Sequence, residues 1–289
     1  MSRFDAPWTD QTLTDPHAVD DKAIRVRRMF AAIASSYDLN NRLHSMGRDQ
    51  AWRRAAVGAA RLRQGETVLD VACGTGDLSL AFARAGAGGV VALDFTDAML
   101  VRARRKEPRP GACTPRYLCA DALKLPITDG IMDVVSIAFG IRNVTDPSAV
   151  MGQFYRVLRP GGRAVILEFS TPAWAPWRAV YQFYFHRVMP RTASWIAGDR
   201  TGAYRYLPRS VDTFLDRPQM LHLLERAGFV NVTLRPLMFG IAVIYTGTKP
   251  GNSTEGNTET AKRDSSNGTL DLSAMAYNNS RLRGVAQLG

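Results

Sequence analysis

Cysteines and long apolar runs are scarce in this chain of 289 residues. Its three cysteines, Cys73, Cys113 and Cys119, show no paired ligand spacing and form no even set. That pattern argues against a zinc site and against a disulfide framework. No apolar run approaches the roughly 20 residues that a membrane-spanning helix needs, and the N-terminus has no apolar export core. The sequence therefore predicts a cytoplasmic protein without a metal site.

Acidic residues are outnumbered, with 26 Asp and Glu against 37 Lys and Arg and a net charge of +11. The last forty residues add nothing to this excess, because their four basic and four acidic residues cancel. Much of the excess lies between Lys22 and Arg63, where basic and apolar residues alternate at helical spacing. Such a surface is either a solvated helical face or a contact with an anionic membrane. RNA is a third alternative, which no recognised nucleic-acid module supports, and we expect no nucleic-acid partner.

A third glycine is missing from the most informative stretch, residues 68–80, which reads VLDVACGTGDLSL. An apolar strand enters a Gly-Thr-Gly turn there and continues into a helix, whose free N–H groups favour a bound ligand. Gly74 and Gly76 lack Cβ atoms, so the backbone can approach that ligand closely. A dinucleotide fingerprint would close with another glycine, whereas Asp77 follows Gly76. The motif therefore argues against NAD or FAD.

Two carboxylates indicate which nucleoside the turn binds. Asp70 ends the first strand, and Asp94 ends the next apolar run, GVVALD. A carboxylate at the second position can accept hydrogen bonds from both ribose hydroxyls. No basic residue accompanies the turn, so the pocket suits a cationic nucleoside without phosphate, such as S-adenosylmethionine. For Asp70, capping of the turn is an alternative role.

Strands and helices alternate along the middle of the chain. We expect strands at 68–72, 89–94, 115–121, 133–139, 163–169, 230–236 and 241–249, and helices at 77–85, 96–106, 147–158 and 217–228. This order predicts a mostly parallel α/β sheet with helices on both faces. Within a single domain, 21–249, residues 21–63 form a helical lid, broken near 38–41 and Gly47, and residues 171–210 an aromatic-rich cap. Residues 1–20 are an irregular leader, and the polar residues 250–289 a disordered tail.

Six motifs carry a more specific similarity. They are MFAAIASSYDLNNRLHSMGRDQAWRR, LDVACGTGDL, SIAFGIRNVTD, RVLRPGGRAVILEFSTP, GDRTGAYRYLPRSV and FGIAVIYTGTK, spread over residues 25–249. With them the chain resembles the UbiE-type C-methyltransferases of menaquinone and ubiquinone biosynthesis. Three features depart from that pattern: the tail after Pro250, Arg209 where an acidic residue is common, and Ala138 where serine is frequent.

The resemblance implies a Rossmann-like class I methyltransferase fold with a seven-stranded sheet. It implies S-adenosylmethionine as donor and a prenylated quinol as acceptor, either demethylmenaquinol or the equivalent benzoquinol, methylated on a ring carbon. From the turn, the acids and the resemblance together, we expect the donor site to contain Asp70, Gly74, Thr75, Gly76, Asp94, Asp121, Ala122 and Ala138.

Arg142 and Asn143 are the expected catalytic residues, since they directly follow the fourth strand, at the carboxyl end of the sheet. We expect both to face the acceptor. Arginine keeps its proton below a pKa of about 12, so Arg142 would stabilise the quinolate oxygen or hold a water, which Asn143 would orient. A loop hydrogen-bond network is the alternative role for this pair.

The acceptor side is expected to include residues of the lid and of the cap. Tyr37, Asp38 and His44 lie in the lid, and any of them could relay the proton. Tyr204 and Tyr206 would close the cap over a flat ring. The cap aromatics would line a tunnel for the prenyl tail, lie in a membrane interface or form the core of a helical cap. Since a prenylated quinol dissolves in the bilayer, we expect peripheral, salt-sensitive membrane contact.

Two other functions stay open. One is a different small-molecule or RNA methyltransferase with the same donor pocket, and the other is a non-catalytic donor-binding component of a quinone-synthesis complex. The sequence leaves open the ring type, the prenyl length, the general base, whether the chain forms a homo-oligomer and the role of the tail.

Overall fold

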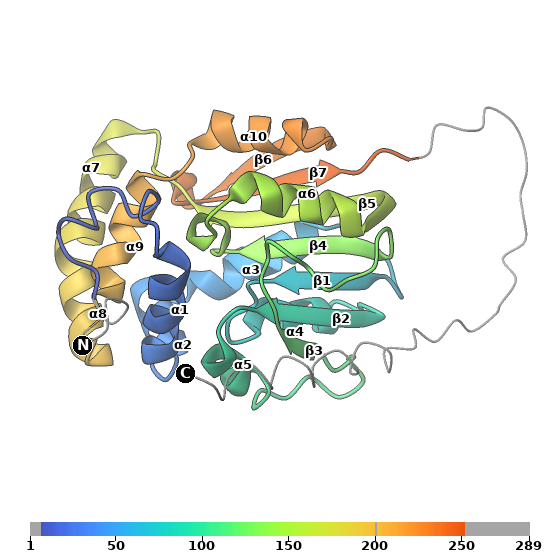
Figure 1. Cartoon of the computed structure of the whole chain (residues 1–289), viewed down its shortest axis with the longest axis horizontal. Helices are drawn as coiled ribbons and strands as arrows, with labels where there is room; N and C mark the ends of the chain where they lie inside the picture. The colour runs from blue at the N-terminus through green and yellow to red at the C-terminus, as the bar shows by residue number, and fades with distance from the viewer. Residues whose placement is uncertain (1–6, 200, 252–289) are drawn as a thin grey trace, which may run out of the picture. The chain divides into compact units, whose positions relative to one another are not determined.

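A single seven-stranded sheet organises the chain in the computed structural model, which describes residues 7–199 and 201–251. The strands are β1 (Thr67–Val71), β2 (Gly89–Asp94), β3 (Arg116–Cys119), β4 (Met132–Ala138), β5 (Leu158–Phe169), β6 (Val230–Leu237) and β7 (Ala242–Thr248). Their order across the sheet is β3-β2-β1-β4-β5-β7-β6. Strands β1 to β5 are parallel, and β7 runs antiparallel between β5 and β6 (Figure 1). The mostly parallel sheet is confirmed.

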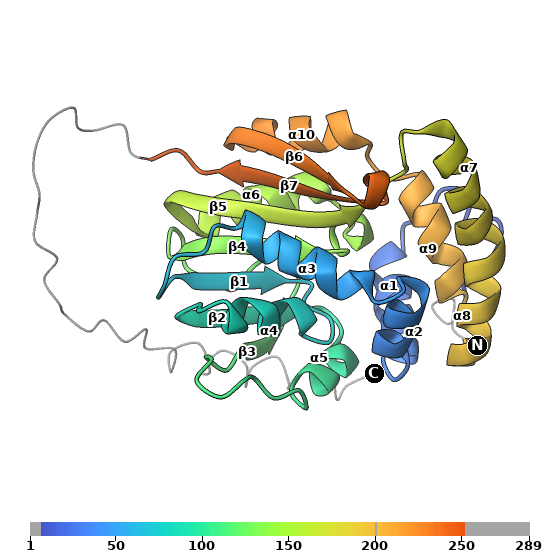
Figure 2. The same cartoon turned by 180° about the vertical axis from the view of Figure 1, so that it is seen from behind.

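Some helices of the described chain cover the faces of the sheet, and others lie beyond one end of it. They are α1 (Lys22–Ile33), α2 (Tyr37–His44), α3 (Arg48–Ala59), α4 (Asp77–Arg84), α5 (Asp97–Ala103), α6 (Pro147–Val157), α7 (Ala175–Phe183), α8 (Met189–Ala197), α9 (Ala203–Asp212) and α10 (Arg217–Arg226). Short helical turns are η1 (Ile141–Asn143), η2 (Tyr184–Val188) and η3 (Met238–Gly240). Helices α6 and α10 cover one face of the sheet, and α3 and α4 cover the other (Figures 1 and 2).

The central strands are buried because helices cover them on both faces. Every residue of β4 before Ala138 is buried, as are the last four residues of β1. Strands covered on both faces read as near-continuous apolar runs, which is why the sequence pattern located them. The chain reverses its winding direction between β1 and β4, and the carboxyl ends of such neighbouring strands form the binding crevice of open α/β sheets.

Helices α1, α2, α7, α8 and α9 lie together beyond one end of the sheet (Figures 1 and 2). Phe139 and Phe169, which directly follow and end β4 and β5, pack against each other at 4.4 Å and against Trp52 at that end. Helices α1 and α2 of the predicted lid therefore cover the carboxyl ends of the strands together with the cap, while α3 lies on a face of the sheet. None of the helices in residues 7–199 and 201–251 is long and apolar enough to cross a membrane.

One detail of the N-terminal prediction needs correction. The predicted break at 38–41 is wrong, since these residues lie inside α2 and the interruption falls at residues 34–36. The break at Gly47 is confirmed, with a positive φ of 73°. The described part of the leader has no helix or strand, yet Trp8 is buried against Tyr206. Most of the predicted tail, from residue 252 on, and residues 1–6 of the leader lie outside the described residues.

Candidate functional site

A cleft lies at the carboxyl ends of β1, β2, β3 and β4, on the sheet side of the lid. Residues of α1 and α2 form its outer wall. Among the expected site residues, those that line this donor cleft are Tyr37, Gly74, Asp94, Asp121, Ala122, Ala138 and Asn143. Five of them, Gly74, Asp94, Asp121, Ala122 and Ala138, are expected donor residues, and their contact with a donor stays a prediction, whereas Tyr37 and Asn143 were expected on the acceptor side.

Asp94 places a buried carboxylate in the cleft. Its Oδ2 accepts a hydrogen bond from the backbone N–H of Gly74 at 2.7 Å, and its Oδ1 accepts one from that of Thr96 at 2.8 Å. Burial raises the pKa of Asp94 to about 6, although these two bonds favour the charged form. Each carboxylate oxygen has a second lone pair, so an ionised Asp94 can still accept from a pair of hydroxyls.

The charges in the donor cleft restrict its ligand. Asp94 and Asp121 both line it, while no lysine or arginine does so among the residues that the structure describes. The Oδ1 atom of Asp121 accepts a hydrogen bond from the backbone of Leu123 at 2.9 Å, which orients the carboxylate. A phosphate would be repelled here, whereas a cationic nucleoside would be attracted.

Asp70 does not line the cleft, so the prediction that it binds the donor directly is wrong. Its side chain is 1% exposed, and its carboxylate accepts hydrogen bonds from the hydroxyls of Ser79 at 2.6 Å and Ser136 at 3.1 Å. These bonds tie β1 to α4 and β4 beneath the glycine turn. Burial raises the pKa of Asp70 to about 6. Its role is closer to the alternative, support of the turn.

Thr75 and Gly76 do not line the cleft either. The hydroxyl of Thr75 donates to Asp38 Oδ1 at 2.5 Å and accepts from Lys106 Nζ at 3.1 Å. A Cβ on Gly76, whose φ is +81°, would lie 2.5 Å from the phenol oxygen of Tyr117. A side chain at position 76 would therefore meet Tyr117, and donor contact by Thr75 and Gly76 stays a prediction.

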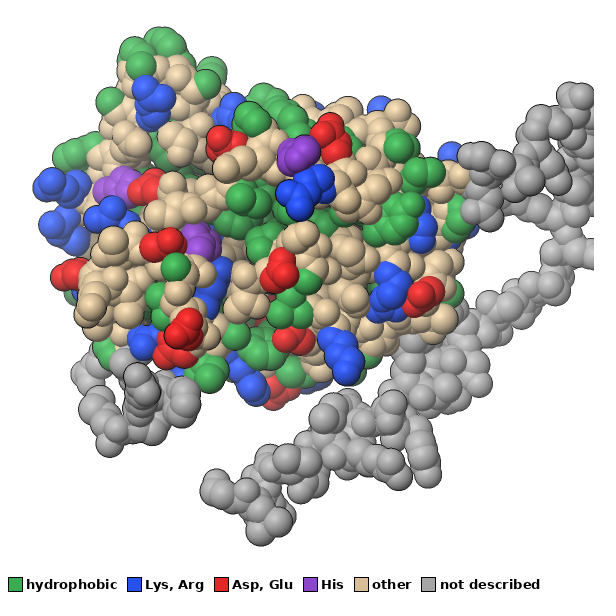
Figure 3. Space-filling view, turned by 45° about the horizontal axis from the view of Figure 1, so that its top comes forward, with side chains coloured by type: hydrophobic (Ala, Val, Ile, Leu, Met, Phe, Trp, Pro, Cys, Tyr) green, Lys and Arg blue, Asp and Glu red, His purple; other side chains and the backbone are tan. Residues whose placement is uncertain are grey.

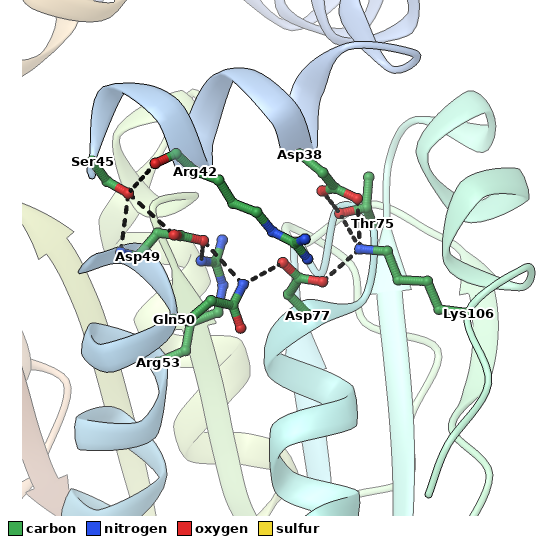
Figure 4. A network of polar contacts seen from close by, with 9 residues as sticks. All are labelled: Asp38, Arg42, Ser45, Asp49, Gln50, Arg53, Thr75, Asp77 and Lys106. Atoms are coloured by element: carbon green, nitrogen blue, oxygen red, sulfur yellow. Dashed lines mark hydrogen bonds and ion pairs between the residues drawn. The ribbon is translucent and has the colours of Figure 1, made fainter. Parts of the chain in front are cut away.

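Lys106, which no sequence pattern indicated, joins the lid to the glycine turn (Figure 4). Its ammonium group lies 2.7 Å from Asp38 Oδ2 in α2 and 2.5 Å from Asp77 Oδ1 in α4. Burial alone would raise the pKa of Asp77, but the charge of Lys106 holds it below its ordinary value. Gln50 of α3 extends the network by donating to both Asp77 and Asp49. The contacts fix α2 and α3 against the glycine turn and the start of α4.

A second, larger cavity lies under the lid and the cap and measures about 520 Å³. Its walls are mainly aromatic and aliphatic side chains from α1, α2, α3, α7, η2 and α9. Of the expected residues, Tyr37, His44, Arg142, Tyr204 and Tyr206 line it. Three residues line both this acceptor cavity and the donor cleft, namely Phe30, Tyr37 and Phe139. The two spaces therefore adjoin.

Arg142 is held rigidly at the wall of the acceptor cavity. Its Nη1 donates to Glu168 Oε1 and to the carbonyl of Phe139, both at 2.7 Å, and its Nε donates to Ser210 Oγ at 3.3 Å. Both members of the ion pair are buried, with Glu168 2% and Arg142 5% exposed. Burial raises the pKa of Glu168, while Arg142 opposes that change. The guanidinium is thus fixed and charged.

Asn143 lies on the other side of this loop, so the prediction that it faces the acceptor is wrong. It lines the donor cleft, and it does not line the acceptor cavity. Its Nδ2 donates to the carbonyl of Phe139 at 3.2 Å, and its Oδ1 accepts from the phenol of Tyr206 at 3.0 Å. One carbonyl, that of Phe139, therefore orients both Arg142 and Asn143.

The three candidates for proton relay are separated by the structure. Asp38 lines neither space, because Thr75 and Lys106 hold its carboxylate. Burial raises the pKa of Tyr37, so its phenol stays protonated at neutral pH. Burial lowers the pKa of His44, so its imidazole is neutral and can accept a proton. His44 is therefore the best base of the three.

Sequence reasoning missed the residues that hold the Arg142 loop in place. Glu168 carries a recognisable signal, since it is an acid near the carboxyl end of an apolar strand. Lys22 carries none, yet it is 2% exposed, and its Nζ donates to the carbonyls of Arg142 at 3.0 Å and Val144 at 2.5 Å. Burial, followed by the charge of Arg142, lowers the pKa of Lys22 to about 8. The lid helix α1 thereby anchors the loop.

Comparisons with known proteins identify the family of the chain. Residues 18–249 match the model of the ubiE/COQ5 methyltransferase family. The chain is 47% identical over 223 residues to the demethylmenaquinone methyltransferase of Thermus thermophilus, covering 77% of this chain and all of that protein. It is 44% identical over 238 residues to the ubiquinone/menaquinone biosynthesis C-methyltransferase UbiE of Geobacter sulfurreducens, covering 81% and 91%.

Solved structures show the same fold at low sequence identity. An S-adenosylmethionine-dependent methyltransferase of Thermotoga maritima superposes with a TM-score of 0.56 at 17% identity, covering 78% of this chain and 99% of that one. The [4+2]-cyclase SpnF superposes with a TM-score of 0.54 at 17% identity, covering 70% and 81%. Since these proteins carry different activities, the likeness concerns the fold alone.

Proposed function

The chain belongs to the ubiE/COQ5 methyltransferase family, and we propose that it transfers a methyl group from S-adenosylmethionine to a ring carbon of a prenylated quinol. One observation carries this proposal: an acidic donor cleft and a large apolar cavity adjoin at Phe30, Tyr37 and Phe139. A methyl donor and an apolar acceptor bound in these two spaces would meet at the shared wall.

The residues of the donor cleft fit S-adenosylmethionine. When bound, this donor supplies a methyl group activated by a sulfonium charge. Asp94 would accept from the ribose hydroxyls, and Asp121 with Ala122 would contact the adenine edge. The two carboxylates, with no basic side chain among the described lining residues, favour a cationic ligand over a phosphorylated one. Ala138 brings only a methyl group to this wall.

The acceptor cavity fits a flat ring that carries an apolar tail. Its volume lies within the usual range of small-molecule sites, about 300 to 1,000 Å³. Aromatic side chains such as Phe139, Phe169 and Tyr204 offer flat surfaces to a ring. The acceptor must be the reduced quinol, because loss of a hydroxyl proton pushes electron density onto the neighbouring carbon. An oxidised quinone is electron-poor there.

Two residues would handle the charge and the proton of the quinol. The bonds of Arg142 to Glu168, Phe139 and Ser210 use Nε and Nη1, so we assign Nη2 to the quinol oxygen. A fixed guanidinium stabilises an oxyanion without reorganising during the reaction. We assign His44 as the group that removes the proton, since its neutral imidazole lines the same cavity.

Purified protein with isotope-labelled S-adenosylmethionine tests the proposal directly. The acceptors are a reduced demethylated prenyl naphthoquinol, the matching benzoquinol, each quinone in its oxidised form, and RNA. We expect label in a quinol product by mass spectrometry, and none in the oxidised forms. Label that enters only RNA would replace the quinol assignment. Donor binding by calorimetry with no labelled product from any acceptor would indicate a non-catalytic donor-binding protein.

A further inference from the structure

Exposed apolar side chains are concentrated on one part of the molecule. Nine of the thirteen exposed large hydrophobic residues that the structure describes lie in α2 and the turn after it, in residues 174–195, or in η3. Trp195 is 85% and Phe239 78% exposed, which is unusual for residues of this size. We call these nine residues the apolar rim: Leu39, Leu43, Met46, Trp174, Val180, Phe183, Val188, Trp195 and Phe239.

The segments of the apolar rim surround the acceptor cavity. The phenol of Tyr184 in η2 donates to the carbonyl of His44 in α2 at 3.2 Å, which joins the cap to the lid. Trp177 of α7 lies 5.9 Å from the ring of Phe239 in η3. Two members of the rim, Met46 and Val180, also line the cavity. Since Met46 is 76% and Val180 59% exposed, we place the mouth of the cavity beside these two residues, within the rim.

Five members of the apolar rim lie in residues 169–198, where the charged side chains are basic. Residues 169–198 include no aspartate or glutamate. Arg178, Arg187 and Arg191 are exposed in this stretch, and none of them forms an ion pair with a carboxylate of the described chain. The carboxylate of Asp212 lies 3.2 Å from His186 of this stretch, and the acids that flank it, Glu168 and Asp199, bond to Phe169 and Ser194. Figure 3 shows hydrophobic and basic side chains side by side on the projection around α7.

We propose that the apolar rim is a docking surface for the anionic face of a lipid bilayer, with the mouth of the acceptor cavity turned toward the acyl chains. Exposed Trp and Phe side chains beside unpaired arginines are typical of segments that lie in a membrane interface without crossing it. A prenylated acceptor would then enter without crossing water, and this part of the inference rests on the proposed function. An acidic protein surface would satisfy the arginines, but it would leave no reason for the cavity to open inside the rim.

Vesicle flotation with the full chain tests the docking surface. We expect binding to vesicles of phosphatidylcholine mixed with phosphatidylglycerol, and much weaker binding to phosphatidylcholine alone or at high salt. The variant W174S/F183S/W195S should bind at least about tenfold more weakly, since it removes aromatic area from the rim. The variant R187Q/R191Q should bind anionic vesicles about fivefold more weakly for each arginine removed, or about 30-fold more weakly for the pair.

Matched controls lie on other surfaces. Val101 and Val230 are exposed apolar residues outside the rim, and Arg226 and Arg235 are exposed arginines of α10 and β6. The variants V101S/V230S and R226Q/R235Q should bind vesicles as the parent protein does. Equal binding by the rim variants and the parent would overturn the docking surface. Loss of self-association in the rim variants, with no vesicle binding by the parent, would assign the surface to a second copy instead.

A second readout separates this inference from the proposed function. The rim variants should methylate a short-chain, water-soluble quinol at the parent rate, but should lose activity on a long-chain quinol held in vesicles. If the parent methylates no quinol and still binds anionic vesicles through the rim, the proposed function fails and the docking surface stands. If it methylates quinols and never binds vesicles, the docking surface fails alone.

Discussion

Replacement of Arg142 by methionine would test whether this arginine acts on the substrate or only supports the loop. The substitution leaves the Glu168 carboxylate buried without its partner, retaining only the backbone donors of Phe169 at 2.8 Å and of residue 142 at 3.4 Å. It also removes the hydrogen bonds to the Phe139 carbonyl and to Ser210. A loss of turnover in this variant alone would therefore mix a structural effect with a chemical one.

The size of the structural effect follows from the burial of the pair. Removing one partner of a buried ion pair costs about 3 to 5 kcal/mol of stability. Burial already raises the pKa of Glu168, and loss of the guanidinium raises it further, so the carboxyl takes up a proton at low pH. Protonation in the folded state favours folding, so the cost should shrink as the pH falls toward the raised pKa. We expect the R142M variant to lose about 3 kcal/mol of its free energy of unfolding at neutral pH.

The double variant R142M/E168M separates the two roles. Apolar side chains in place of a buried ion pair usually leave stability unchanged or improved. This variant should therefore unfold in urea near the parent midpoint and bind S-adenosylmethionine within a few fold by calorimetry. Its kcat with the quinol should fall by about 100- to 1,000-fold, the loss expected for one oxyanion donor. Parent-like kcat in the double variant would remove the catalytic role, and parent-like stability of R142M would refute the account of the pair.

Three further predictions concern the donor cleft and the glycine turn beside it. Asp94→Ala should weaken donor affinity by about 1 to 3 kcal/mol in calorimetry, and unchanged affinity would remove its ribose assignment. Gly76→Ala should lower the free energy of unfolding in urea by about 1 to 3 kcal/mol more than Gly111→Ala does. Both glycines have a φ of +81°, but only a Cβ at position 76 would meet Tyr117. Equal losses of stability in the two variants would contradict the contact. As the pH falls from 7 to 5, the free energy of unfolding of the parent should rise by about 1.4 kcal/mol relative to that of Asp70→Asn. Folded Asp70 has a pKa of about 6, so it takes up a proton before the unfolded chain does. Parallel stability profiles of the two proteins against pH would refute that pKa.

Strand positions were predictable because their signal is local. The expected strand at 89–94 coincides with β2, and that at 133–139 is one residue from β4 at both ends. Both are apolar runs that helices cover on two faces, bounded by turn residues. The order of the strands has no such local signal. In particular, β7 enters between β5 and β6 because three distant segments pair there.

Helix boundaries in the lid were predicted less well. The Asp-Leu-Asn-Asn sequence at 38–41 has the composition of a turn, yet it forms part of α2. The carboxylate of Asp38 could cap a turn locally, but it bonds instead to Thr75 and Lys106. Those partners are 37 and 68 positions away along the chain, so no local pattern could have indicated them.

For the site, positions fixed by backbone geometry were predicted, and side-chain directions were not. Gly74 and Asp94 lie where a strand ends at the crevice, so the strand pattern alone placed them on the cleft. For Asp70, Thr75 and Asn143, position along the chain was right, but the side chain points to the interior, to the lid or to the opposite space. Those directions depend on partners from other elements.

Lys106 shows how these distant contacts couple the two spaces. It follows α5, and its ammonium group lies against Asp38 of the lid and Asp77 of α4 at the same time (Figure 4). Asp38 is adjacent to Tyr37, which lines both the donor cleft and the acceptor cavity. The contacts that hold α2 on the glycine turn therefore also hold Tyr37 between donor and acceptor. Lys106 lines neither space, yet a change there would remove the ion pairs that hold the wall common to both.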